Sequence, residues 1–329
     1  MFNLIECNQF CPTYMLWVEK VVIKSAGMGA SCFSIVCLLS NFLRRSATAA
    51  GLSSQTVEID GDTTIHFWGP TAATSKPNLV LIHGFGPPSL WQWRQQISFF
   101  AGEFDVYVPD LLFFGDSFTN STDRSEVFQA TCLAKLLENL QIHRYSVVGT
   151  SYGGFVAYLM AAASPEKVEK VVIASSAVNM RRSDNDRLMK KAKVDKIEDL
   201  MLPTTASGLR TLLDLVLFRR PYMPEFLLND FLDKLYSENR KEKLELLKEL
   251  RIGQDEVVTI SPLSQETLIV WGEQDQIFLL EKATELNKLL GEKAKLKVIK
   301  KASHCPQLER ADQFNNIVND FFVHGFNMY

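Results

Sequence analysis

The sequence predicts an α/β protein built on a mostly parallel β-sheet with helices on both of its faces. Six short runs of nearly continuous apolar, β-branched residues recur along the chain, which is typical of strands covered on both sides. Helix-like segments lie between these runs, and a repeated alternation of strand and helix implies that the strands are parallel. The six runs are 78–83, 105–111, 145–150, 170–175, 267–272 and 296–302.

Two further strand candidates precede the first of these runs. Residues 55–60 and 63–70 flank a Gly-Asp pair, which is typical of the turn of a β-hairpin. Together with the six runs, these two segments predict an eight-stranded sheet. Gly291 is placed to end the last predicted helix. Helices are expected at 91–101, 125–140 and 279–291.

The alternation is interrupted once, at about residues 178–262. This stretch has no convincing strand, and prolines separate its amphipathic helical segments 209–218, 225–236 and 240–251. Long excursions from a compact domain are often functional. We therefore expect an α/β domain at 51–329 that carries an inserted helical cap at about 178–262.

The N-terminal extension, residues 1–50, differs from the rest of the chain. Residues 25–43 carry no charge and precede Arg44 and Arg45, which suits a membrane anchor in length and basic flank. Its serines and small residues equally favour a peripheral helical extension, and a cleaved targeting segment is a third hypothesis. The six cysteines suggest no disulfide framework, which favours a reduced, intracellular location. The apolar segment 25–43 would then be the part of the chain that associates with a membrane.

Composition excludes several classes of function. The net charge of −3 supplies no basic face for phosphates, so nucleic acid is not an expected partner. The zinc motifs HExxH and CxxC…CxxC and the nucleotide-binding motif GxGxxG do not occur in the sequence, so no metal and no cofactor are expected. Nothing in the sequence indicates an oligomeric state.

Ser151 is the candidate nucleophile. It lies in Gly149-Thr150-Ser151-Tyr152-Gly153, where the strand 145–150 ends and a helix begins. A nucleophile on such a sharp turn needs very small neighbours, and it faces the N-terminus of the following helix. The alternative interpretation, a glycine-rich packing turn, does not explain why an apolar strand ends on a serine.

A serine hydroxyl needs a base, and His304 is the best-placed histidine. It follows the last predicted strand and precedes the helix that begins near Pro306. The remaining histidines are worse placed: His66 lies in the hairpin, His143 at the far end of the nucleophile strand and His324 in the C-terminal helix.

Asp275 is the candidate carboxylate partner of His304, because it directly follows the strand 267–272 and gives the order Ser, Asp, His. Glu273 is nearer that strand and is interpreted as a loop carboxylate. Asp184 or Asp186 remains an alternative acid. Asp110 and Asp116 are interpreted instead as residues that hold neighbouring loops.

The developing oxyanion requires two N–H donors. The backbone N–H of Tyr152 is one candidate. The second is the N–H of Phe85 in His83-Gly84-Phe85-Gly86, where the glycines allow the backbone to turn inward and His83 orients the loop.

Five stretches in family order now resemble the α/β-hydrolase superfamily, and more narrowly the plant serine hydrolases similar to membrane-anchored monoacylglycerol lipases. The resemblance covers about residues 55–324 and implies the same triad, oxyanion donors and cap. Serine at position 151, where aspartate would be expected in epoxide hydrolases and dehalogenases, speaks against those branches. The stretches are HGFG (83–86), PDLLFFGDS (109–117), GTSYGGF (149–155), WGEQDQIF (271–278) and SHCPQLER (303–310).

The expected function is that of a serine carboxylesterase or lipase acting on lipid or small apolar esters through an acyl-enzyme on Ser151. Two alternatives stay open: a carbon-carbon bond hydrolase with the same triad, and a hydrolase-derived receptor that binds a ligand. Apolar side chains of the cap are expected to shape an acyl pocket, namely Leu213, Val216, Leu217, Phe218, Phe226 and Phe231.

Overall fold

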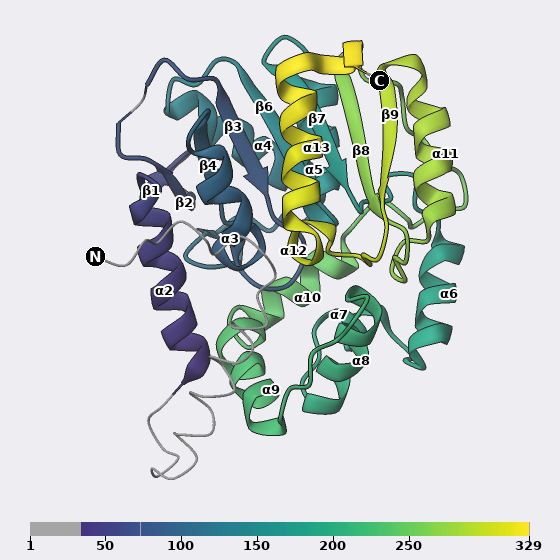
Figure 1. The fold of residues 1–329 in the computed structure, drawn as a ribbon. Coiled ribbons are helices and arrows are strands. Elements are labelled where there is room, and N and C mark those ends of the chain that lie inside the picture. Colours follow the sequence, from purple (N-terminus) through teal and green to yellow (C-terminus); the bar gives the residue numbers. More distant parts are fainter. Residues whose placement is uncertain (1–33, 73, 329) are drawn as a thin grey trace.

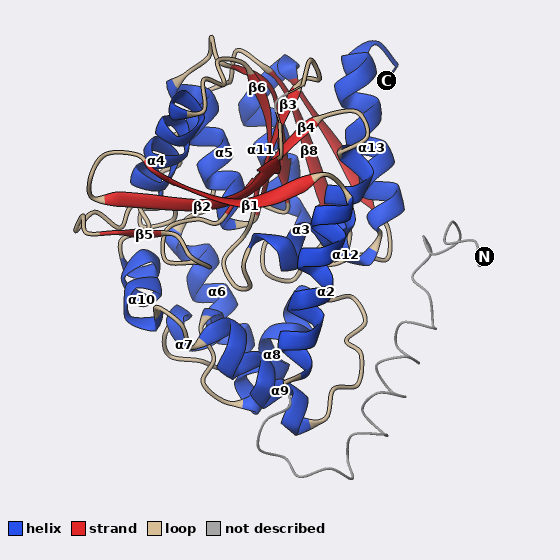
Figure 2. Ribbon diagram, turned by 90° about the vertical axis from the view of Figure 1, so that its left-hand side faces the viewer, coloured by secondary structure: helices blue, strands red, loops and turns tan. Residues whose placement is uncertain are grey.

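The computed structural model describes residues 34–72 and 74–328, which form a twisted sheet between two layers of helices (Figures 1 and 2). The sheet follows the order β1-β2-β4-β3-β6-β7-β8-β9, and β5 pairs with β2. The strands are β1 (Leu52–Glu58), β2 (Thr63–Pro70), β3 (Asn78–Ile82), β4 (Asp105–Pro109), β5 (Phe118–Thr119), β6 (Tyr145–Thr150), β7 (Val168–Ala174), β8 (Glu266–Gly272) and β9 (Ala294–Ile299).

The predicted fold class is confirmed, with one correction to the strand count. From β4 through β3, β6, β7 and β8 to β9 every pairing is parallel, whereas β1 and β2 form the antiparallel hairpin. The sheet has nine strands instead of the eight predicted. The additional strand, β5, has only two residues, which is too short for a periodic pattern to be visible in the sequence.

Helices cover the sheet on both faces. On one face, α3 (Ser89–Phe100) and α13 (Ala311–His324) bury Trp93, Phe314 and Phe321 in one hydrophobic cluster. On the other face, α4 (Glu126–Asn139), α5 (Tyr152–Ala163) and α11 (Leu280–Leu290) contribute to a second, larger cluster. Gly291 ends α11 with a φ of 78°, as the sequence predicted.

The predicted N-terminal extension contributes a helix to the folded body. Helix α2 (Ile35–Ala49) buries Ile35, Val36 and Leu43 and packs on α3 and β1 (Figure 1). No helix in the described part of the chain combines the length and apolar character needed to cross a membrane. Residues 25–33 of the predicted anchor lie outside the described residues, so association of 25–43 with a membrane stays a prediction.

All regular elements of the segment between β7 and β8 are helices. It lies beyond the carboxyl ends of the parallel strands (Figure 1). Its elements are α6 (Arg182–Ala192), α7 (Ile197–Met201), α8 (Ala206–Val216), α9 (Glu225–Phe231), the π-helix η1 (Leu232–Tyr236) and α10 (Arg240–Lys248). A short helix after β9, α12 (Pro306–Glu309), completes the elements around the site.

Candidate active site

Ser151 stands on the sharp turn between β6 and α5. Its φ of 51° and ψ of −122° place it in a region that non-glycine residues rarely adopt, and this strain is typical of functional positions. Its backbone N–H donates to Ala174 O of the neighbouring strand at 2.9 Å. Ser176 Oγ donates to Ser151 O at 2.6 Å, so the turn is held from the β7 side as well.

The two glycines that flank the turn are there because the backbone approaches too closely for a side chain. A Cβ atom at Gly149 would overlap the Gly153 carbonyl, and one at Gly153 would overlap the carbonyl oxygens of Ile82 and His83. Helix α5 can therefore begin directly against β3 and β6, which is the close approach that the GxSxG spacing predicted.

The structure brings Ser151, His304 and Asp275 together, although they lie on three different loops. His304 Nε2 is 3.0 Å from Ser151 Oγ, and His304 Nδ1 is 2.9 Å from Asp275 Oδ2. Asp275 is 4% exposed and His304 5% exposed, so both are shielded from solvent. This is hydrogen-bonding distance for a nucleophile, a base and a group that orients the base.

The Asp275 carboxylate is itself fixed by the chain that follows it. Its Oδ1 accepts hydrogen bonds from Ile277 N at 2.9 Å and Phe278 N at 3.0 Å. The Phe278 ring packs edge-on against the His304 imidazole, with ring centroids 5.5 Å apart. The loop after β8 therefore sets the orientation of both the carboxylate and the imidazole.

The loop after β3 lies directly beside the nucleophile, since a Cβ atom at Gly84 would be 2.9 Å from Ser151 Cβ. The Phe85 N–H and the Tyr152 N–H, predicted as oxyanion donors, have no hydrogen-bond acceptor within the described residues. Gln92 clamps this loop: its Oε1 accepts from Gly84 N at 2.9 Å, and its Nε2 donates to Gly84 O at 2.8 Å and to Pro87 O at 2.6 Å.

His83 has a different task from His304. Its Nε2 accepts a hydrogen bond from Leu111 N at 2.9 Å, so its Nδ1 carries the proton and donates to Gly84 O at 2.8 Å. Burial lowers the pKa of His83, which favours the neutral imidazole. Both ring nitrogens are thus used to hold the loop, in agreement with the predicted orienting role.

Of the two alternative acids, Asp186 is exposed on α6, and Asp184 is engaged elsewhere, as is Asp110. Asp184 accepts a hydrogen bond from Arg181 N and forms an ion pair with Lys282 at 3.0 Å. Asp110 lies 2.8 Å from His66 Nδ1 and accepts a hydrogen bond from Ser89 N, which agrees with the predicted loop-holding role. The structure records no contact between His304 and either of these carboxylates.

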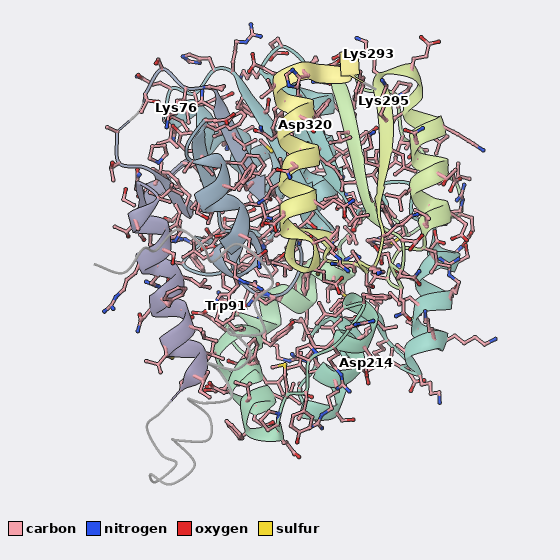
Figure 3. All side chains as sticks on the ribbon, viewed as in Figure 1. Lys76, Trp91, Asp214, Lys293, Lys295 and Asp320 are labelled. Carbon is pink, nitrogen blue, oxygen red and sulfur yellow. The ribbon has the colours of Figure 1, made fainter. Side chains whose placement is uncertain are left out.

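The inserted helices contact both sides of the site. The end of α8 meets the loops that carry Asp275 and His304: Ser303 Oγ is 3.0 Å from Leu215 O, and Phe218 N donates to Glu309 Oε1 at 2.6 Å. On the opposite side, Asn239 Nδ2 donates to Phe113 O at 3.2 Å. Figure 3 labels Trp91, which belongs to α3, and Asp214, which belongs to α8 of the insertion.

The apolar residues expected to shape an acyl pocket separate into two groups. Leu213, Val216 and Phe231 are partly buried and pack against the main hydrophobic cluster, and the Phe231 and Trp91 ring centroids are 5.5 Å apart. Leu217 and Phe218 are partly buried as well. Phe226 is 54% exposed, so in this structure it faces outward from α9. An amphipathic pattern identifies the apolar face of a helix but not the neighbour that covers it.

Several residues that position the site could not be identified from the sequence. Gln92, Ser176 and Glu309 hold the oxyanion loop, the nucleophile turn and the histidine loop, respectively. A buried glutamine in α3 or a serine after β7 belongs to no motif. Glu309 lies in the stretch SHCPQLER, but its partner Phe218 is 91 residues away.

Comparisons with known proteins identify the family of the chain. Residues 77–311 match the family model described as alpha/beta hydrolase fold. A 2-hydroxy-6-oxononadienedioate/2-hydroxy-6-oxononatrienedioate hydrolase from Paraburkholderia xenovorans (strain LB400) is 25% identical over 292 residues, which are 85% of this chain and 98% of that protein. A monoacylglycerol lipase from Mus musculus is 25% identical over 261 residues, 75% of this chain and 76% of that protein.

Among solved structures, a membrane phospholipase A superimposes with a TM-score of 0.73 and 21% identity, covering 96% of this chain and all of the other. At that identity the likeness shows the fold alone. The family model spans most of the chain and includes the strand ends that carry Ser151, Asp275 and His304. The chain is therefore a hydrolase that belongs to the alpha/beta hydrolase fold family.

Proposed function

We propose that the protein is a serine carboxylesterase or lipase that cleaves lipid or small apolar esters. The observation that carries this proposal is the hydrogen-bonded chain from Ser151 Oγ through the His304 imidazole to the Asp275 carboxylate. A serine that faces a base oriented in this way is set up to attack a carbonyl carbon.

In the proposed reaction, Ser151 Oγ attacks the ester carbonyl while His304 Nε2 takes the hydroxyl proton. The oxyanion is stabilised by the N–H groups of Phe85 and Tyr152, which is worth about 3–4 kcal/mol for a single donor in well-studied hydrolases. His304 then gives the proton to the leaving alcohol, and an acyl-enzyme remains. His304 next removes a proton from water, and the water oxygen attacks the acyl carbon. The bond between that carbon and Ser151 Oγ then breaks, the acid leaves, and His304 returns the proton to Ser151 Oγ.

The comparisons support this proposal and one competitor. The relative from Mus musculus is named a monoacylglycerol lipase, which favours lipid esters. The relative from Paraburkholderia xenovorans is named for 2-hydroxy-6-oxo dienedioates, which favours hydrolysis of a carbon-carbon bond by the same three residues. The narrower resemblance to plant hydrolases stays a prediction.

A fluorophosphonate probe tests the nucleophile directly. We expect it to label the wild-type protein and not Ser151→Ala, whereas Ser207→Ala, which removes an exposed serine of α8, should be labelled normally. Failure of folded wild-type protein to react would contradict the proposal.

A substrate panel then separates the two reactions. Esters of one alcohol with acids of graded chain length should be turned over by the wild-type protein and not by Ser151→Ala. Rapid turnover of a 2-hydroxy-6-oxo dienoate with negligible turnover of every ester would replace the esterase proposal with the carbon-carbon hydrolase.

A further inference from the structure

Tyr236 brings a phenolic hydroxyl from the insertion to the oxyanion loop. It is the last residue of the π-helix η1, an element that occurs frequently at functional sites. The residue is 7% exposed. A Cβ atom at Gly86, the residue after Phe85, would lie 3.6 Å from Tyr236 Oη, so the hydroxyl rests against this loop.

The surroundings of Tyr236 determine its protonation state. Burial raises the pKa of its phenol, and the Cys305 thiol, next to His304 in the chain, raises it further. Because its pKa is raised, the hydroxyl keeps its proton at neutral pH and can donate a hydrogen bond.

The Tyr236 hydroxyl has no hydrogen-bond partner in the part of the chain that the structure describes. Tyr158, another buried tyrosine, shows the usual arrangement: its Oη accepts from Ser261 N at 2.9 Å and donates to Ser261 O at 3.1 Å. The hydroxyls of Tyr145 and Tyr152 are sealed from solvent without a partner, whereas that of Tyr236 keeps some accessible surface. A buried donor without a partner destabilises the fold, so the Tyr236 hydroxyl, which rests against the oxyanion loop, is available to pair with a bound molecule.

We propose that the Tyr236 hydroxyl donates a hydrogen bond to an oxygen atom of the substrate other than the carbonyl that Ser151 attacks. This inference rests on the proposed function and narrows it, because it selects esters that carry a second oxygen over esters of plain hydrocarbon groups. The extra oxygen belongs either to the alcohol or to the acyl chain. A polar residue of the insertion, placed against Gly86 of the oxyanion loop, then sets specificity while Ser151, His304 and Asp275 perform the reaction.

Tyr236→Phe removes only the hydroxyl and tests the inference through substrate preference. Two matched pairs of esters are compared by kcat/KM: a glyceryl and a propyl ester of one acid, and a hydroxyalkanoate and an alkanoate ester of one alcohol. We expect the wild-type protein to prefer the oxygenated member of at least one pair. In Tyr236→Phe that preference should fall at least about tenfold, because kcat/KM for the oxygenated ester falls much further than kcat/KM for the plain ester.

Tyr158→Phe is the matched control, since it removes a buried phenolic hydroxyl that contacts Ser261 instead of the site. It should lower stability and leave both preferences unchanged. Two results would overturn the inference and leave ester hydrolysis standing. One is a Tyr236→Phe variant whose kcat/KM ratios in both pairs equal those of the wild-type protein, and the other is an equal loss of kcat/KM on plain and oxygenated esters. Wild-type inactivity toward all four esters would overturn both proposals.

Discussion

The clamp that Gln92 forms on the oxyanion loop gives the sharpest prediction. The side chain is 8% exposed and makes three hydrogen bonds to the backbone of Gly84 and Pro87. Gln92→Ala removes all three and leaves the buried Gly84 N–H without an acceptor. Each lost bond is worth about 0.5–1.5 kcal/mol, so for three bonds we expect a loss of about 1.5–4.5 kcal/mol in unfolding free energy, towards the upper end because the Gly84 N–H stays unsatisfied.

The same change should lower catalysis through the position of Phe85. Removal of an oxyanion donor costs about 100- to 1000-fold in kcat, and a donor that is loosened instead of removed should cost less. We therefore expect kcat to fall about 10- to 100-fold, equivalent to about 1.4–2.7 kcal/mol. KM should change little, because the donors bind the transition state more tightly than the ground state.

The assay is steady-state kinetics with an activated short-chain ester, paired with urea unfolding. Gln265→Ala is the control: this buried glutamine donates to Ala161 O at 3.0 Å and lies just before β8, at the end of the sheet remote from Ser151. It should lower stability without lowering kcat. Folded Gln92→Ala with a kcat within about twofold of wild type would refute the reasoning, since the donors would then need no clamp.

Two further predictions concern the carboxylates. Asp275→Asn should lower kcat by about four orders of magnitude, because an amide no longer holds the required His304 tautomer. Asp184→Asn should keep near wild-type turnover of the same ester. The reverse pattern would make Asp184 the acid. Arg181 and Lys282 lower the pKa of Glu285 from its ordinary 4.5 to about 2. Because this pKa is lowered, the ionised Glu285 stabilises the fold above pH 4.5, and that stability is lost as the pH falls through 2. Glu285→Gln should therefore be about 1 kcal/mol less stable than wild type at neutral pH and nearly equal to it below pH 2. Unfolding followed by circular dichroism at a series of pH values measures this difference. Parallel stability curves from pH 7 to pH 2 would contradict this assignment.

The strands and the order of the site residues could be predicted because they depend on local pattern. Apolar β-branched runs identified β3, β4, β6, β7, β8 and β9 within a few residues. In a parallel sheet the carboxyl ends of all strands meet at one edge, so residues that directly follow strands, such as Ser151 and Asp275, were expected to lie together. The glycines on either side of Ser151 predicted that α5 approaches the sheet closely.

The N-terminal helix shows where such reasoning fails. The sequence of residues 34–49 is compatible with an anchor, a free extension or a packed helix, and its own pattern does not choose among them. Ser34 Oγ donates to Asp230 Oδ1 at 2.7 Å, and Val36 N donates to Asp230 Oδ2 at 2.9 Å. These contacts join α2 to α9 across more than 190 residues of chain, and only the tertiary structure decides them.

The sequence by itself determined the fold class, the strand-to-helix turn at Ser151 and the positions of Asp275 and His304 along the chain, because periodicity and glycine spacing are local properties. Tertiary structure alone decided that Gln92 clamps Gly84, that Glu309 joins Phe218 to the histidine loop and that Tyr236 reaches Gly86. Those contacts depend on how helices far apart in the chain pack over the ends of the strands. A hydrogen bond between distant residues needs only a donor and an acceptor at the right place, and it leaves no periodic pattern in the sequence.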